Sequence, residues 1–238
     1  MLTAPIVAIG GAVLVAGTAA FCAINALPPK QRLPAEAAGD RIDDFSELNQ
    51  FEPPLRRIGF VGASRVGKTT LLMHVVQQPA PTNTRTDDPY AVISTIVGKP
   101  AVYFALVDAA GQQFSQQFKV ADESEILVVC LDHTADDHHP AISQVRLNEH
   151  AAFLTQMLGH LKTRGTMPAY THFLLNKRDL WESNVQRSEL EAWFAEQVAL
   201  WSAMPGTRVT SSRHSNFKAE DTTAFIARLR DFLNMRCA

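Results

Sequence analysis

The chain has 238 residues, of which 46% are hydrophobic and 19% are charged, and its formal net charge is −2 at pH 7. This balance gives no electrostatic basis for nucleic-acid binding, so we expect no nucleic-acid partner. The three cysteines are far apart, which excludes a zinc spacing and a disulfide framework and favours a reducing compartment. The length suits one α/β domain of about 180 residues plus a tail.

Residues 4–27 form a nearly continuous apolar run, and no charged side chain precedes Lys30. As a helix this run would be about 36 Å long, enough to cross a bilayer core of about 30 Å. A cleaved signal peptide is the alternative, but it would have a basic start and a shorter apolar stretch. We therefore expect residues 1–27 to be a transmembrane anchor. Because Lys30 and Arg32 follow it, the positive-inside rule predicts a single-pass protein with its N-terminus outside and its domain in the cytoplasm.

Residues 28–55 are predicted to be a flexible linker, because five prolines and mixed charges interrupt any apolar periodicity. Within this segment some apolar residues have helical spacing and predict a short amphipathic helix against the domain or the lipid surface: Ile42, Phe45, Leu48 and Phe51. The folded domain is expected to cover residues 56–238.

From residue 57 onward the chain alternates between apolar runs and helical patterns. Strands are predicted at 57–61, 90–97, 101–107, 126–131 and 170–175, and a brief sixth at 208–210. Residues 98–100, Gly-Lys-Pro, predict a hairpin turn between two of these strands. We therefore expect a three-layer α/β/α fold whose mainly parallel, six-stranded sheet has one antiparallel edge strand.

Residues 62–69 read G-x-x-x-x-G-K-T and stand between the first predicted strand and a helix. In this context the pattern is typical of a phosphate-binding loop, because backbone N–H groups converge on the phosphates at a helix N-terminus. Lys68 would add a point charge, and the Thr69 hydroxyl would bind Mg²⁺. The candidate phosphate-binding residues are Gly62, Ser64, Arg65, Val66, Gly67, Lys68, Thr69 and Thr70.

The third apolar run ends in Asp108-Ala109-Ala110-Gly111-Gln112. A carboxylate at this strand end is placed to hold Mg²⁺ through water, and the backbone N–H of Gly111 would meet a γ-phosphate. The alternative is an ordinary aspartate at a strand end.

Asn176-Lys177-Arg178-Asp179 follows the strand at 170–175. The Asp179 carboxylate can accept two hydrogen bonds from guanine, a pair that adenine does not offer, while the Lys177 stem covers the base. Asn176 would tie this loop to the glycine-rich loop. Ser211, Ser212 and Arg213 follow the last predicted strand, where their backbone N–H groups would contact guanine O6.

In this order the four motifs resemble those of the Ras-like small GTPases, over about residues 56–236. The resemblance implies a P-loop GTPase that binds GTP or GDP with Mg²⁺ and hydrolyses GTP slowly without a partner, with Lys68 and Gln112 as catalytic residues. It also implies a switch threonine that binds Mg²⁺; Thr86 suits this role by spacing, and Thr82, Thr84 and Thr95 are rivals.

Switch regions at about 82–90 and 108–120 would face an effector or regulatory protein. Arg65 stands where many Ras-like GTPases carry a small residue. Its side chain would hinder the arginine finger of an activating protein or contact a partner; the alternative is that it is simply solvated. The N-terminal anchor resembles the architecture of the signal recognition particle receptor β subunit. The alternative function is a GTP-bound membrane receptor or scaffold in which hydrolysis is incidental or absent.

Overall fold

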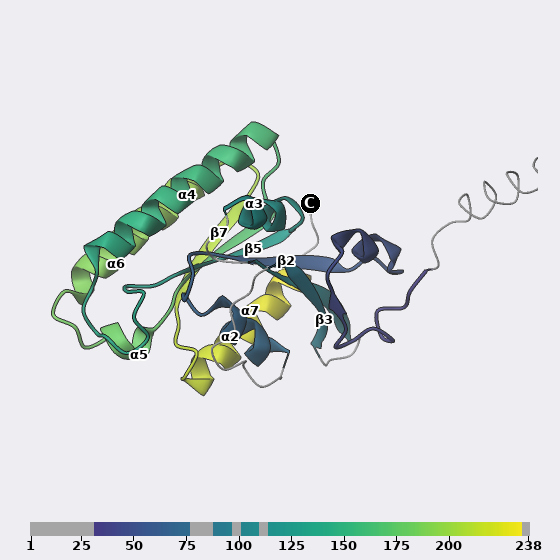
Figure 1. The fold of residues 1–238 in the computed structure, drawn as a ribbon, viewed down its shortest axis with the longest axis horizontal. Coiled ribbons are helices and arrows are strands. Elements are labelled where there is room, and N and C mark those ends of the chain that lie inside the picture. Colours follow the sequence, from purple (N-terminus) through teal and green to yellow (C-terminus); the bar gives the residue numbers. More distant parts are fainter. Residues whose placement is uncertain (1–30, 77–87, 97–100, 110–113, 235–238) are drawn as a thin grey trace, which may run out of the picture.

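The computed structural model describes residues 31–76, 88–96, 101–109 and 114–234, and a mixed sheet forms its centre (Figure 1). Within these ranges the sheet has seven strands in the order β1-β3-β4-β2-β5-β6-β7. β3 (Tyr90–Ile96) runs antiparallel to both of its neighbours, β4 and β1 (Arg41–Ile42). The other neighbours pair in parallel: β4 (Val102–Asp108), β2 (Arg56–Val61), β5 (Ile126–Leu131), β6 (Tyr170–Leu175) and β7 (Arg208–Arg213).

The mainly parallel sheet and the antiparallel pairing of β3 with β4 confirm two features expected from the sequence. The expected number of six strands was wrong, because β1 adds a seventh. β3 is therefore not the edge strand, since β1 covers its outer side. A two-residue strand is too short to produce an alternating pattern, which is why the sequence did not indicate it. The predicted turn at 98–100 lies outside the described residues.

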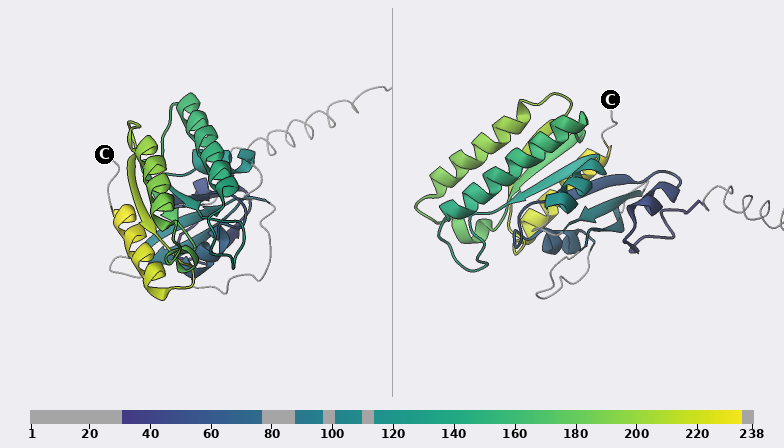
Figure 2. Two further views of the ribbon diagram at one scale, coloured as in Figure 1. Left: turned by 90° about the vertical axis from the view of Figure 1, so that its left-hand side faces the viewer. Right: turned by 45° about the horizontal axis from the view of Figure 1, so that its top comes forward.

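Helices cover both faces of the sheet, which confirms the α/β/α layering (Figures 1 and 2). One face carries α2 (Lys68–Val75) and α7 (Ala219–Asn234), and their apolar side chains share one buried cluster with the sheet. The other face carries α3 (Phe114–Asp122), α4 (Gln144–Arg164) and α6 (Arg187–Ser202). All six residues of β5 and of β6 are buried, as expected for strands covered on both faces.

The segment expected to be a flexible linker is packed on the domain from residue 31 onward. It contains β1 and a 3₁₀ helix, Phe45–Gln50, that Asp44 caps by accepting a hydrogen bond from the Ser46 N–H. Its apolar side chains are buried in the same cluster as α3, α4 and α6: Ala37, Ile42, Phe45, Leu48, Phe51 and Leu55. The structure thus places the predicted amphipathic segment against the domain.

The predicted transmembrane anchor, residues 1–27, lies outside the described residues. In the ranges that the structure describes, no helix is both long and apolar enough to cross a membrane.

Candidate functional site

The glycine-rich loop joins the end of β2 to the start of α2. Gly62 and Gly67 have φ values of 142° and 90°, which side chains other than glycine rarely adopt. A Cβ atom on Gly62 would lie 2.2 Å from the Cys130 carbonyl oxygen of β5, and one on Gly67 would lie 2.5 Å from the Asn176 amide nitrogen. Both glycines are therefore required because the loop passes close to neighbouring strand ends.

Lys68 begins α2 and its side chain turns back over the loop. Its Nζ donates hydrogen bonds to the carbonyl oxygens of Gly62 at 2.8 Å and Ala63 at 3.2 Å. Burial lowers the pKa of the Lys68 ammonium, and the nearby Asp108 carboxylate opposes this shift. The loop is thus closed around a buried cation, which is the arrangement expected of a phosphate site.

Thr69, in the first turn of α2, meets Asp108, the last residue of β4. The Thr69 Oγ1 donates to Asp108 Oδ2 at 2.8 Å, and Asp108 is fully buried. A hydroxyl and one carboxylate are ligands that Mg²⁺ prefers when phosphate oxygens complete its coordination. The residues present therefore fit a magnesium ion, and Thr69 and Asp108 would hold it.

The other candidates for the γ-phosphate and the metal fall mostly on residues that the structure leaves undescribed: Thr82, Thr84, Thr86, Gly111 and Gln112. Thr95 is described, and it pairs with Tyr103 inside the β3–β4 hairpin, whereas Asp108 pairs with Tyr90. Five residues of strand separate Thr95 from this pair, or about 17 Å. Thr95 is therefore too distant to share a metal with Asp108.

A second loop, after β6, is attached to the glycine-rich loop. Asn176 donates from its Nδ2 to the Val66 carbonyl oxygen at 2.8 Å, as the sequence predicted. The backbone carbonyl oxygen of Asn176 accepts a hydrogen bond from Trp181 Nε1 at 2.8 Å. Asp179 follows in the first turn of α5 (Arg178–Trp181), where its Oδ1 accepts from Ser215 Oγ at 2.5 Å. The expected base-reading carboxylate is thus held beside the loop that follows β7.

Ser211, Ser212 and Arg213, predicted to contact the base from a loop, lie inside β7. The predicted strand ended at Thr210, but β7 continues through Arg213, which pairs with Leu175. Ser212 Oγ lies 2.9 Å from His172 Nε2, in a contact across the sheet between β6 and β7. The predicted strand end at Thr210 was therefore wrong, and the assignment of these three residues to the base site stays a prediction.

Ser215 and Asn216, in the loop that follows β7, contact two other predicted parts of the site. Ser215 contacts Asp179, and the Asn216 Nδ2 donates to the Gly67 carbonyl oxygen at 3.0 Å. The loop after β7 therefore touches both the base-reading carboxylate and the glycine-rich loop. In the sequence, the polar stretch continues beyond Arg213, which is a signal that the loop lies further along the chain. The end of β7 itself could not be located, because the strand is short and polar.

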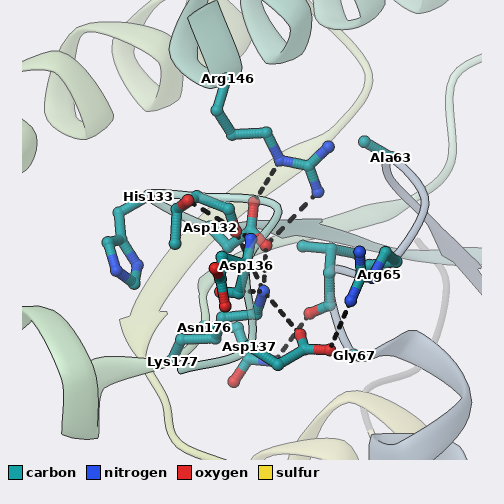
Figure 3. A network of polar contacts seen from close by, with 12 residues as sticks. Ala63, Arg65, Gly67, Asp132, His133, Asp136, Asp137, Arg146, Asn176 and Lys177 are labelled. Atoms are coloured by element: carbon teal, nitrogen blue, oxygen red, sulfur yellow. Dashed lines mark hydrogen bonds and ion pairs between the residues drawn. The ribbon is translucent and has the colours of Figure 1, made fainter. Parts of the chain in front are cut away.

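A buried ionic network, which sequence reasoning missed, lies behind the glycine-rich loop (Figure 3). Its centre is Asp132, at the end of β5, which contacts Arg146 Nε at 2.6 Å, His150 Nε2 at 2.8 Å and Lys177 Nζ at 2.9 Å. Burial alone would raise the pKa of Asp132, but hydrogen bonds from His150 and Arg146 outweigh it and lower the pKa well below its usual value. Asp132 therefore stays charged inside the protein.

This network reaches the glycine-rich loop at two points. Arg146 donates to the Ser64 carbonyl oxygen at 2.8 Å, and Arg65 pairs with Asp137 at 3.4 Å. Asp137 in turn lies 3.0 Å from Lys177 Nζ. Because Lys177 is held at its ammonium end by these acids, its stem is fixed beside the loop, as covering a base would require. Arg65 is 63% exposed, so its pairing contributes little stability.

Residues 57–164 match the family model described as 50S ribosome-binding GTPase. No curated protein matches the chain. The matched range includes the glycine-rich loop and Asp108 and ends before Asn176 and Asp179, so it bears on the phosphate side of the site. The match supports a P-loop GTPase, with guanine-nucleotide binding and GTP hydrolysis as the general activity of such a domain.

Proposed function

Starting from a P-loop GTPase domain, we propose that this chain is a membrane-anchored small GTPase of the Ras-like type that alternates between GTP and GDP. The observation that carries the proposal is the 2.8 Å contact between Thr69 Oγ1 and Asp108 Oδ2 beside the buried Lys68 ammonium. A hydroxyl, a carboxylate and a cation at one loop form a site for Mg²⁺ and phosphate together.

In this proposal Lys68 and the backbone N–H groups of the loop hold the β- and γ-phosphates. Thr69, Asp108 and Thr86 would hold Mg²⁺, which would supply positive charge beside the phosphate oxygens. Gln112 orients the attacking water, and the N–H of Gly111 senses the γ-phosphate; both roles rest on the sequence motif. Asp179 accepts hydrogen bonds from guanine N1–H and its amino group, held in place by Ser215.

Residues 1–27 anchor the chain in a membrane, with the N-terminus outside and the GTPase domain in the cytoplasm. The packed segment begins at residue 31, within a few residues of the anchor. The domain would therefore sit close to the bilayer surface, and its switch regions at 82–90 and 108–120 would meet an effector or regulator there. This layout resembles that of the signal recognition particle receptor β subunit.

The test uses the full-length chain and compares binding of GDP and ADP by calorimetry, with and without Mg²⁺. We expect GDP to bind far more tightly than ADP, and Asp179→Asn to remove this preference because an amide no longer matches both guanine donors. Equal binding of ADP by the parent protein would exclude the assignment to guanine.

Single-turnover hydrolysis of GTP then separates a switch from a receptor or scaffold that merely holds GTP. We expect slow hydrolysis that Gln112→Leu reduces at least tenfold, since water would no longer be oriented. Tight GTP binding without Gln112-dependent hydrolysis would favour the receptor or scaffold.

A further inference from the structure

Phe217 is an exposed aromatic residue in the loop between β7 and α7. Its side chain is 82% exposed, and among the phenylalanines, tyrosines and tryptophans of the described ranges only Phe114 is also exposed. A single exposed apolar side chain is common on protein surfaces and needs no explanation by itself. Phe217 differs from such isolated residues in two ways: its loop contacts Asp179 and the glycine-rich loop, and its backbone is held by hydrogen bonds.

The loop that carries Phe217 is held at both ends by backbone hydrogen bonds. His214 donates from its N–H to Leu175 at 2.9 Å, and its carbonyl oxygen accepts from the Arg178 N–H at 2.9 Å. The Ser215 N–H donates to Asp221 Oδ2 at 2.8 Å, at the start of α7. The exposed ring is therefore carried by a loop whose backbone is fixed by hydrogen bonds.

Phe217 is also linked, through Ser215, to the carboxylate expected to read the base. Ser215 Oγ donates to Asp179 at 2.5 Å and accepts from the Phe217 N–H at 3.1 Å. On the other side, Asn216 is bonded to Gly67 at 3.0 Å. One hydroxyl thus connects the backbone of Phe217 to Asp179, so the exposed ring belongs to the loop that holds the carboxylate expected to read the base.

We propose that the Phe217 ring stacks on the face of the purine whose edge is read by Asp179. This inference rests on the proposed guanine-nucleotide function and adds a residue that holds the base. Stacking on an aromatic ring is tolerant of base identity because every base has a π face, whereas Asp179 distinguishes guanine by its donors. Phe217 therefore supplies affinity and Asp179 supplies selectivity. Because the loop is already ordered, little conformational entropy is lost when the base arrives.

The experiment measures dissociation constants of GDP and GTP for the full-length chain by competition with a fluorescent GDP analogue. Phe217→Ala is expected to weaken both nucleotides about tenfold and by the same factor, since the contact does not involve the γ-phosphate. The guanine-to-adenine preference should stay unchanged. Phe217→Tyr should bind like the parent protein, and Phe217→Leu should fall between, because leucine keeps apolar area but not the π face.

Two measurements exclude a merely structural effect. The melting temperature without nucleotide should not change in Phe217→Ala, because the ring is exposed. Phe217→Trp should show fluorescence quenching on GDP addition beyond that of the parent, since its indole would lie against the base. Val185→Ala, a change at a 97% exposed residue in the loop before α6, is the matched control and should bind GDP normally.

The outcomes separate the two proposals. If the parent protein binds GDP in an Asp179-dependent manner and Phe217→Ala binds equally well, the stacking role is overturned and the guanine site stands; the ring would then be left as a surface for a partner protein. If the parent protein does not bind GDP, both proposals are overturned.

Discussion

The guanidinium of Arg146, in the first turn of α4, donates a hydrogen bond to the carbonyl oxygen of Ser64 at a distance of 2.8 Å. The same guanidinium contacts the buried Asp132 through Nε at 2.6 Å. One side chain therefore connects a helix on the outside of the sheet to the backbone of the glycine-rich loop. The position of this loop depends on the ionic network as well as on its own glycines.

Arg146→Met should destabilise the protein by about 3 kcal/mol, because Asp132 would lose a buried partner and keep only His150 and Lys177. Urea unfolding measures this loss. Arg187→Met provides the control, since Arg187 and Glu191 form an exposed pair whose removal should cost less than about 1 kcal/mol. Equal losses in the two variants would show that the buried network does not stabilise the fold.

Ser215→Ala should weaken GDP binding about tenfold and reduce the preference for guanine over adenine. The hydroxyl orients Asp179, and losing a hydrogen bond to a charged group typically costs about 1.5–3 kcal/mol, part of which water can replace. Calorimetric titration with GDP and ADP measures both effects. Ser202→Ala is the control, because Ser202 Oγ bonds only to the Val198 carbonyl oxygen among the contacts described for its helix. Unchanged GDP affinity in Ser215→Ala would argue against the positioning role.

His172 should make the protein less stable in mild acid. Its buried ring lies 2.9 Å from both Thr210 Oγ1 and Ser212 Oγ. Burial, reinforced by the positive charge of Arg228 and by His214, lowers the pKa of His172 to about 3 in the folded protein, against 6.5 for an ordinary histidine. Between these values only the unfolded chain takes up the proton, so stability is complete above about pH 6.5 and is lost as the pH falls toward 3, at about 1.4 kcal/mol per pH unit.

The measurement is urea unfolding at pH 7.5 and pH 5. His172→Gln should lose about 2 kcal/mol less than the parent protein between these two conditions, because glutamine does not titrate. His138→Gln, at an exposed histidine, should behave like the parent protein. An identical pH dependence in His172→Gln and the parent would contradict the buried, neutral state of His172.

Leu48→Ala should destabilise the domain by about 2–5 kcal/mol, the usual cost of a cavity at a buried leucine. Leu48 is 2% exposed and belongs to the segment that packs beside the sheet before β2. Leu33→Ala is the same substitution at a 54% exposed position of that segment and should change stability by less than about 0.5 kcal/mol. Thermal unfolding compares the two, and equal stabilities would mean that residues 31–55 are not part of the cooperative unit.

The sequence was sufficient to predict the strands from β2 to β6, because each is an apolar run of ordinary length bounded by polar residues. It was less informative at β7. That strand is half-buried along most of its length and has serine and threonine at its centre, so its end could not be located. The sequence therefore predicted a strand end at Thr210, whereas β7 ends at Arg213. The parallel pairing of Leu175 with Arg213 in the structure shows that β7 continues to residue 213.

The sequence by itself was enough to predict the phosphate-binding residues, since the glycines, Lys68 and Thr69 are neighbours in the chain and their chemistry is local. It also indicated the strands from β2 to β6 and the helices α2, α4, α6 and α7, because periodicity is a property of short segments. Only the tertiary structure decided that residues 31–55 complete the sheet, that Ser215 holds Asp179, and that Asp132 gathers Arg146, His150 and Lys177. These relationships join residues distant along the chain, and they depend on strand register and burial, which no local pattern encodes.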